Sequence, residues 1–99
     1  MAFVVINTVR ASQEDLPGII ADVQRQSLDG LRAHPGFRSA RFLAAEDETE
    51  VAMIVEWDSR DHFVAYRQTD EGRRGIAAAV ALHPRIAFYN VIMAIDPTA

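Results

Sequence analysis

The chain has 99 residues and a formal net charge of −4, and this length predicts a single domain spanning residues 1–99. It contains no cysteine, which excludes disulfides, thiolate metal ligands and a cysteine nucleophile. All of its basic residues are arginine, which excludes Schiff-base chemistry on lysine. The acidic balance and the absence of a long apolar run predict a cytoplasmic protein that binds neither nucleic acid nor membranes.

Residues 2–10 alternate as a β-strand does, with Phe3, Val5, Asn7 and Val9 on one face. A polar amide among apolar neighbours is unusual, because burying it without a partner costs roughly 1–3 kcal/mol. Two interpretations of Asn7 follow. In the first, Asn7 is a functional residue. In the second, its role is structural: its side chain forms a hydrogen bond in the region of residues 56–58, or it lies at an edge of the sheet.

A long amphipathic helix is predicted next, with Ser12 as its N-cap and the sequence His34-Pro35-Gly36 as its end. Its apolar face recurs at three- and four-residue spacing through Leu16, Ile19, Ile20, Val23, Ser27, Leu28 and Leu31. Residues 37–45 and 50–57 then predict two strands joined by an acidic hairpin loop. Alternation in the second of these strands places Val51, Met53, Val55 and Trp57 on one face.

Two shorter helices and a last strand complete the predicted chain. Asp58 or Ser59 caps a helix that carries Phe63 and Tyr66, and Thr69-Asp70 caps a second helix over residues 72–82. Residues 84–95 predict the last strand. The order is the split βαββαβ or ferredoxin-like plan, an α+β fold in which helices cover one face of an antiparallel sheet. The other face keeps apolar residues that favour a covering partner: Val4, Ile6, Ile54, Val91 and Met93.

Several kinds of chemistry are not indicated. His34, His62 and His83 are far apart and show no metal-ligand spacing, so we expect no metal site. No serine lies in a nucleophile elbow, and the glycines form no phosphate-binding motif. His62 lies one turn past Trp57, and it is interpreted either as an exposed helix residue or as part of a site.

A cleft between sheet and helices is the remaining candidate site. Trp57, Met53 and Val55 share a strand face, and Asn7 can join them from the first strand. Phe63 and Tyr66 approach from the short helix, and Arg73 or Arg74 from the next one. An apolar pocket with a few polar groups is the usual form of a small-molecule site, although a lone tryptophan at a strand end is also a common core residue.

The pattern resembles the antibiotic biosynthesis monooxygenase (ABM) domain family. The resemblance runs from about Phe3 to Ile95 and rests on the sequences His34-Pro35-Gly36-Phe37 and Glu56-Trp57-Asp58-Ser59, followed by Phe63 and Tyr66. It implies a dimeric α+β barrel. Some members oxidise anthrone-like intermediates to quinones with O2 alone, without metal, flavin or haem, and Trp57 matches the tryptophan that these members carry.

Four positions depart from one or other branch of the family. The quinone-forming members have an asparagine four residues before the tryptophan and a tyrosine six residues after it, where this chain has Met53 and Phe63. The haem-degrading branch matches at Asn7, but it places a tryptophan at the position of Tyr66 and a histidine at that of Ile76.

The resulting prediction is a homodimeric, cofactor-independent monooxygenase that oxidises a phenolic or anthrone-type polycyclic aromatic with O2. The predicted catalytic residues are Trp57, Asn7 and Tyr66. The predicted substrate-binding residues are Phe63, Met53, Phe42, Val55, His62 and Arg73. Two alternatives remain open: a non-catalytic or cyclase-like binding dimer on the same fold, and a structural dimer whose own side chains fill the cleft.

Overall fold

The computed structural model describes residues 1–12 and 14–97, and for residues 23 and 26–29 it describes the backbone only. The elements in chain order are β1 (Phe3–Arg10), α1 (Leu16–Ala33), β2 (Phe37–Ala44), β3 (Glu50–Trp57), α2 (Arg60–Gln68), α3 (Asp70–Val80) and β4 (Arg85–Asn90). This order confirms the predicted ferredoxin-like α+β plan, with α2 and α3 together forming its second helical segment.

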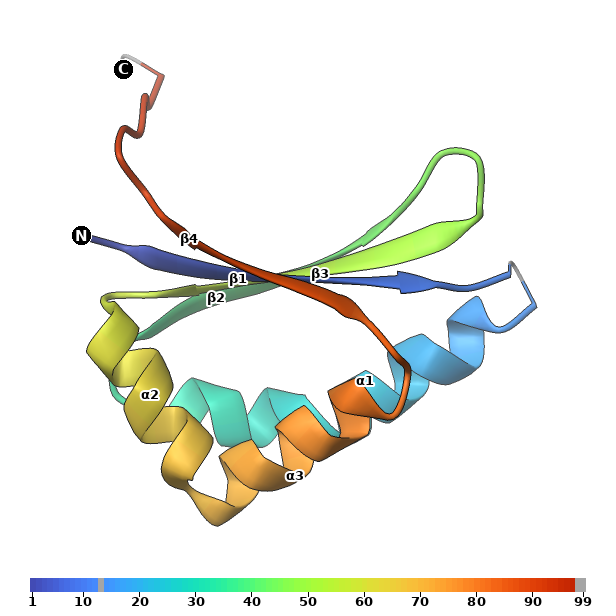
Figure 1. Cartoon of the computed structure of the whole chain (residues 1–99), viewed down its shortest axis with the longest axis horizontal. Helices are drawn as coiled ribbons and strands as arrows, with labels where there is room; N and C mark the ends of the chain where they lie inside the picture. Colours follow the sequence, from blue (N-terminus) through green and yellow to red (C-terminus); the bar gives the residue numbers. More distant parts are fainter. Residues whose placement is uncertain (13, 98–99) are drawn as a thin grey trace.

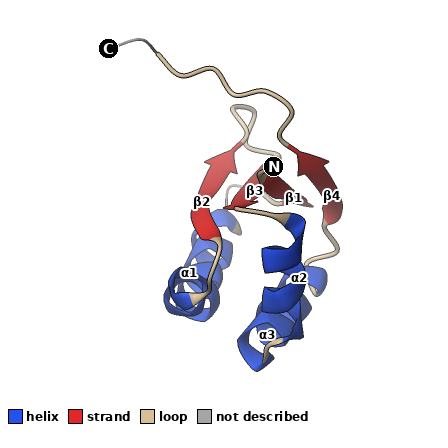
Figure 2. Ribbon diagram, turned by 90° about the vertical axis from the view of Figure 1, so that its left-hand side faces the viewer, coloured by secondary structure: helices blue, strands red, loops and turns tan. Residues whose placement is uncertain are grey.

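The four strands form one antiparallel sheet in the order β2-β3-β1-β4, and the helices cover one of its faces (Figures 1 and 2). On the two central strands Phe3 pairs with Trp57, and Asn7 pairs with Met53. Among the described residues, no helix has the length and apolar character needed to cross a bilayer.

The core lies between the sheet and the helices, as the alternation in β1 and β3 predicts. Trp57 is its most deeply buried side chain, with 1% of its surface exposed. The other members come from both central strands and from α1 and α2: Phe3, Val5, Leu31, Val55, Phe63 and Tyr66. Burial of large aromatic rings supplies much of the apolar stabilisation of so small a chain.

α1 begins at Leu16, so the prediction of Ser12 as its N-cap is wrong. Proline fits only the first turn of a helix, and Pro17 occupies that turn. Ser12 instead closes the preceding turn: its carbonyl oxygen accepts from the backbone N–H groups of Asp15 and Leu16, at 3.0 and 3.2 Å. Its hydroxyl donates to the carboxylate of Asp15 at 2.8 Å.

The caps of the two shorter helices follow the sequence. Ser59 is the N-cap of α2, and its hydroxyl oxygen accepts from the backbone N–H of His62. Thr69 ends α2 and caps α3, because its hydroxyl donates to the Tyr66 carbonyl at 2.7 Å and accepts from the Gly72 N–H at 3.0 Å. α3 therefore starts at Asp70 and ends at Val80, two residues earlier at each end than predicted.

β4 is shorter than the predicted strand over residues 84–95. It is an edge strand that pairs only with β1, and the ladder ends where Asn90 meets Phe3. One further hydrogen bond joins the Val91 N–H to the Ala2 carbonyl at 2.9 Å. Residues 91–97 then leave the sheet on the side away from the helices (Figure 2). The prediction that Val91 and Met93 belong to the open sheet face is therefore wrong.

Candidate functional site

The turn before β2 fixes the end of β3 that carries Trp57. Gly36 has a φ of +83°, a left-handed conformation that glycine adopts without strain. Its carbonyl accepts from the Asp58 N–H at 2.7 Å, and the next residue, Phe37, packs edge-on against the Trp57 ring at 5.8 Å between centroids. The two sequence motifs on which the family resemblance rests are therefore in direct contact.

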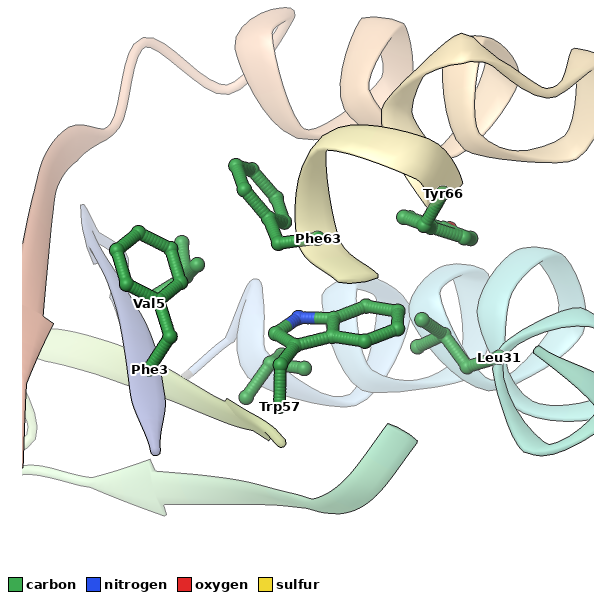
Figure 3. Packing of buried hydrophobic residues seen from close by; sticks show 7 residues of the cluster. Phe3, Val5, Leu31, Trp57, Phe63 and Tyr66 are labelled. Carbon is green, nitrogen blue, oxygen red and sulfur yellow. The ribbon is translucent and has the colours of Figure 1, made fainter. Parts of the chain in front are cut away.

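Trp57 lies at the centre of an aromatic cluster between β3 and α2. Figure 3 shows Phe63 and Tyr66 projecting from α2 toward the indole, with Leu31 of α1 beside it. The centroid of the Trp57 ring system lies 5.1 Å from that of Tyr66 and 6.2 Å from that of Phe63. Such spacing is typical of favourable aromatic packing and holds the indole in one orientation.

Two adjoining cavities separate the helix-covered face of the sheet from the helices. The first, which we name the Trp57 chamber, has a volume of about 210 Å³ and is lined by Val5, Asn7, Leu31, Met53, Val55, Trp57, Phe63, Tyr66, Arg67, Gly75, Ile76, Ala79, Val80, Ile86 and Phe88. The second, the Phe42 chamber, has a volume of about 300 Å³ and is lined by Asn7, Val9, Ile19, Asp22, Phe42, Val51, Met53, Gly75, Ala78, Ala79, Ala81, Leu82 and Pro84. The side chains of this chain therefore leave the cleft partly open.

Two buried polar atoms of the Trp57 chamber have no hydrogen-bond partner within the described part of the chain. They are Oδ1 of Asn7, a hydrogen-bond acceptor, and Nε1 of Trp57, a donor. One interpretation of the sequence is a hydrogen bond from Asn7 to the region of residues 56–58. Asn7 Oδ1 makes no such bond. Leaving such atoms unpaired costs about 1–3 kcal/mol each, so the chamber favours a ligand that offers both a donor and an acceptor.

Tyr66 brings a buried phenol to the same chamber. Burial raises its pKa above the ordinary value of 10.0, and the nearby charge of Glu71 raises the pKa further. The phenol is therefore protonated at neutral pH and can donate a proton or a hydrogen bond. Its hydroxyl faces Gly75, where a Cβ atom would lie only 3.0 Å from the phenol oxygen.

A polar pair lies behind the Tyr66 ring. His34 packs edge-on against it with centroids 4.8 Å apart. Nε2 of His34 lies 3.1 Å from Oε2 of Glu71, at hydrogen-bonding distance. This pair connects the end of α1 to the first turn of α3, the helix that covers both chambers.

Most of the predicted site residues meet in the two chambers. Trp57, Asn7, Tyr66, Phe63, Met53 and Val55 line the Trp57 chamber, and Phe42 lines the Phe42 chamber. His62 lines neither chamber; its Nδ1 bonds to the Ser59 hydroxyl at 2.7 Å, and its ring covers Gly36. Arg73 is exposed on α3 and also lies outside both chambers.

Sequence reasoning missed Arg67. It is the charged residue among the described residues that line the Trp57 chamber, and its guanidinium lies over the Phe63 ring, 5.6 Å from the centroid. The four-residue spacing from Phe63 on α2 is the signal that could have found it, because residues so spaced share a helix face. Arg67 adds a positive charge at the rim of the chamber.

Candidate metal ligands are not assembled anywhere in the described residues. No group of three or more histidine, cysteine, aspartate or glutamate side chains is placed to hold an ion there. At the site the chain itself offers hydrogen bonding, proton donation, aromatic packing and the positive charge of Arg67.

Several solved structures share this fold. Rv0793 from Mycobacterium tuberculosis superposes with a TM-score of 0.77 at 15% identity, covering 97% of this chain and 100% of that one. A monooxygenase from the gene ActVA-Orf6 of Streptomyces coelicolor, solved with the ligand nanaomycin D, has a TM-score of 0.75 at 24% identity, covering 98% and 93%. SnoaB, a cofactor-independent oxygenase from Streptomyces nogalater, has a TM-score of 0.68 at 17% identity, covering 97% and 96%.

A search of curated proteins finds no match. The sequence model of the family described as "Antibiotic biosynthesis monooxygenase" matches residues 2–78, from the start of the sheet to the last turn of α3. The match includes the strand that carries Trp57 and most of the residues that line the two chambers. The chain therefore belongs to the antibiotic biosynthesis monooxygenase family.

Proposed function

We propose that this protein is a cofactor-independent monooxygenase that oxidises a phenolic or anthrone-type polycyclic aromatic compound with O2. The observation that carries the proposal is the pair of unpartnered atoms, Asn7 Oδ1 and Trp57 Nε1, in a largely apolar chamber. A flat phenolic compound offers a hydroxyl for the first atom and an oxygen acceptor for the second. Family membership and the fold shared with SnoaB support the same class of reaction.

In the proposed reaction the substrate supplies the electrons. An anthrone loses a proton to give an electron-rich anion, which passes one electron to O2. The substrate radical and superoxide then join through a new C–O bond, and the resulting peroxide takes up a proton. Cleavage of the O–O bond releases water, and loss of the remaining C–H proton leaves the quinone carbonyl, so one oxygen atom enters the product.

The chain's part in this reaction is to position the substrate and to stabilise charge. Asn7 Oδ1 accepts a hydrogen bond from a substrate hydroxyl, and Trp57 Nε1 donates to the oxygen that becomes negative. Tyr66 is protonated at neutral pH because burial and Glu71 raise its pKa, so it can give a proton to the peroxide. Arg67 at the rim favours the anionic form of the substrate.

A second function, a non-catalytic or cyclase-like binding module, is favoured by two specific residues. Met53 and Phe63 line the Trp57 chamber where quinone-forming members carry asparagine and tyrosine. They make the wall more apolar, which suits binding but removes two groups that could stabilise an anion.

An oxidation assay separates the two functions. The purified protein is mixed with dithranol in air, and both O2 uptake and quinone absorbance are followed for wild type, Trp57→Phe and Arg73→Gln. The monooxygenase proposal expects wild type and the exposed-site control Arg73→Gln to exceed the uncatalysed rate, and Trp57→Phe to be at least about tenfold slower, the effect of losing one charge-assisted hydrogen bond. Background rates in all three, with dithranol still bound to wild type, would favour the binding module.

We also propose that the protein acts as a homodimer. Val4, Ile6 and Ile54 on the open face of the sheet are only half-buried in the single chain. The segment over residues 91–97 leaves the sheet on that side (Figure 1), with Ile92 and Ile95 91% and 87% exposed. A second copy packed on this face would bury both sets of apolar residues.

Light scattering after gel filtration tests the dimer. We expect wild type at twice the chain mass of 11.0 kDa. Ile54→Asp, on the open face, should shift the protein toward the monomer, whereas Ala65→Asp, on the exposed side of α2, should not. A monomeric wild type at micromolar concentration would contradict the proposal.

A further inference from the structure

The Trp57 chamber and the Phe42 chamber share part of their walls. Asn7, Met53, Gly75 and Ala79 line both, and we name these four residues the waist. Asn7 and Met53 face each other on β1 and β3 and form its floor. Gly75 and Ala79 are one helical turn apart on α3 and form its roof. The two chambers therefore meet across a floor of strands and a roof of one helix.

The roof is made of unusually small residues. A packed interior would place large apolar side chains where a helix covers a sheet. α3 instead presents Gly75 and Ala79 at the waist and Ala78 in the Phe42 chamber. At Gly75 even a methyl group would approach the Tyr66 hydroxyl oxygen to 3.0 Å, so a side chain at this position would crowd that hydroxyl.

A buried and unpaired polar group lies at the waist. Asn7 is only 8% exposed, lines both chambers, and has no partner for Oδ1 in the described part of the chain. An acceptor in this position selects a ligand with a hydroxyl or amine at its middle, because an apolar ligand would leave it unsatisfied.

The walls of the Phe42 chamber beyond the waist are largely apolar. Phe42, Val51 and Ile19 contribute to them, and its charged residue, Asp22, is exposed and forms an ion pair with Arg25. Such a space accepts an alkyl chain or an additional ring more readily than a polar group.

We propose that the two chambers hold a single elongated ligand. Its fused aromatic rings lie in the Trp57 chamber, a hydroxyl at the waist donates to Asn7 Oδ1, and an alkyl substituent or further ring fills the Phe42 chamber. The small residues Gly75, Ala78 and Ala79 then determine how long a ligand the protein can bind. This inference rests on the proposed function and narrows its substrate class to extended phenolic polycycles.

A binding experiment with two unreactive probes tests the inference. The compact probe is 1,8-dihydroxyanthraquinone, and the extended probe is its 3-hexyl derivative. Because Trp57 is the single tryptophan, quenching of its fluorescence reports occupation of the Trp57 chamber. Wild type should bind the extended probe at least about tenfold more tightly, the effect of burying two methylene groups.

Three variants locate the origin of that preference. Ala78→Leu and Ala81→Leu add bulk only on the Phe42 side, and each should remove the tenfold preference while changing the affinity for the compact probe less than about twofold. Ala77→Leu, an exposed change on the same helix, should leave both affinities unaltered. Ala81 is exposed in the turn after α3, so its variant decides the question if Ala78→Leu is poorly folded.

The outcomes are distinguishable. Equal affinity of wild type for the two probes, or a preference that survives Ala81→Leu, would overturn the inference while the compact probe still bound as the proposed function requires. Failure of both probes to bind wild type would count against the proposed substrate class and against this inference together.

Discussion

Asn7 and Trp57 lie on adjacent strands, on the same face of the sheet; both line the Trp57 chamber, and each carries one buried polar atom without a hydrogen-bond partner among the described residues. Asn7 pairs with Met53, four residues before Trp57 on β3, so the two positions are roughly 13 Å apart along the strands. One atom is an acceptor and the other a donor. A ligand that satisfies both must therefore extend along the strand direction and carry both kinds of group.

Replacing Asn7 by leucine should stabilise the protein and weaken ligand binding. Leucine has a similar size and removes the unsatisfied Oδ1, so we expect the free energy of unfolding to rise by about 1–2 kcal/mol, or Tm by roughly 4–16 °C. Thermal and urea unfolding measure the first effect, and probe titration the second. Met53→Leu, an apolar exchange at the facing position, should change stability by less than about 1.5 kcal/mol. A destabilised Asn7→Leu protein would show that the amide is paired in the ligand-free state.

Tyr66 should ionise at a higher pH than an ordinary tyrosine. Absorbance titration of the Tyr89→Phe protein isolates its signal, because the chain has two tyrosines. Glu71→Gln should lower the midpoint toward 10.0, since burial and then the charge of Glu71 raise this pKa. Asp70→Asn, on the same helical turn, is the matched control.

The same shift affects stability at alkaline pH. The folded pKa of Tyr66 lies above the unfolded value, so the folded state holds this proton more tightly. The stabilising contribution is complete below about pH 10 and is lost as pH rises through the folded pKa. The stability difference between wild type and Tyr66→Phe should therefore shrink above pH 10, and a difference that stays constant would count against a raised pKa.

Gly36 and Gly18 should respond in opposite ways to alanine. At Gly36 the positive φ disfavours alanine, and a Cβ atom would overlap the His62 ring, so we expect a loss of about 2–4 kcal/mol. At Gly18, in α1, no atom lies within 4 Å of the added Cβ, and alanine should stabilise the helix by about 0.5–1 kcal/mol. Urea unfolding measures both. Because Gly36 holds the turn against Asp58, its variant should also weaken probe binding at Trp57.

Introducing the polar groups of the quinone-forming members tests whether the apolar wall limits the proposed oxidation. Met53→Asn and Phe63→Tyr together place an amide and a phenol in the Trp57 chamber. If anion stabilisation is limiting, dithranol oxidation should accelerate about tenfold or more, as expected for one added charge-assisted hydrogen bond. The pair Met53→Leu and Phe63→Leu is the apolar control. Equal rates in the two double variants would mean that the wall is not what limits turnover.

The amino-acid sequence by itself determined the order of the helices and strands. It also determined which side chains share a face of β1 and of β3. Alternation has a period of two, so Asn7 and Trp57 had to share the face of their apolar neighbours, and the structure confirms it. Caps and turns are equally local: Ser59, Thr69 and Gly36 act as their residue types predict. Element boundaries shift where two local signals compete: Ser12 and Pro17 both mark a helix start, and α1 begins at Leu16.

Tertiary structure decided what no local pattern contains. β4 ends at Asn90 because its antiparallel partner β1 begins at Phe3, a pairing between distant segments. Arg67 reaches the rim of the Trp57 chamber, and His62 turns toward Gly36, because of how α2 packs on β3. The two chambers and the unpaired Oδ1 of Asn7 exist because α3 lays its smallest residues over the β1–β3 pair. Free space and unsatisfied hydrogen bonds depend on every neighbour at once, so they appear only when the whole chain is folded.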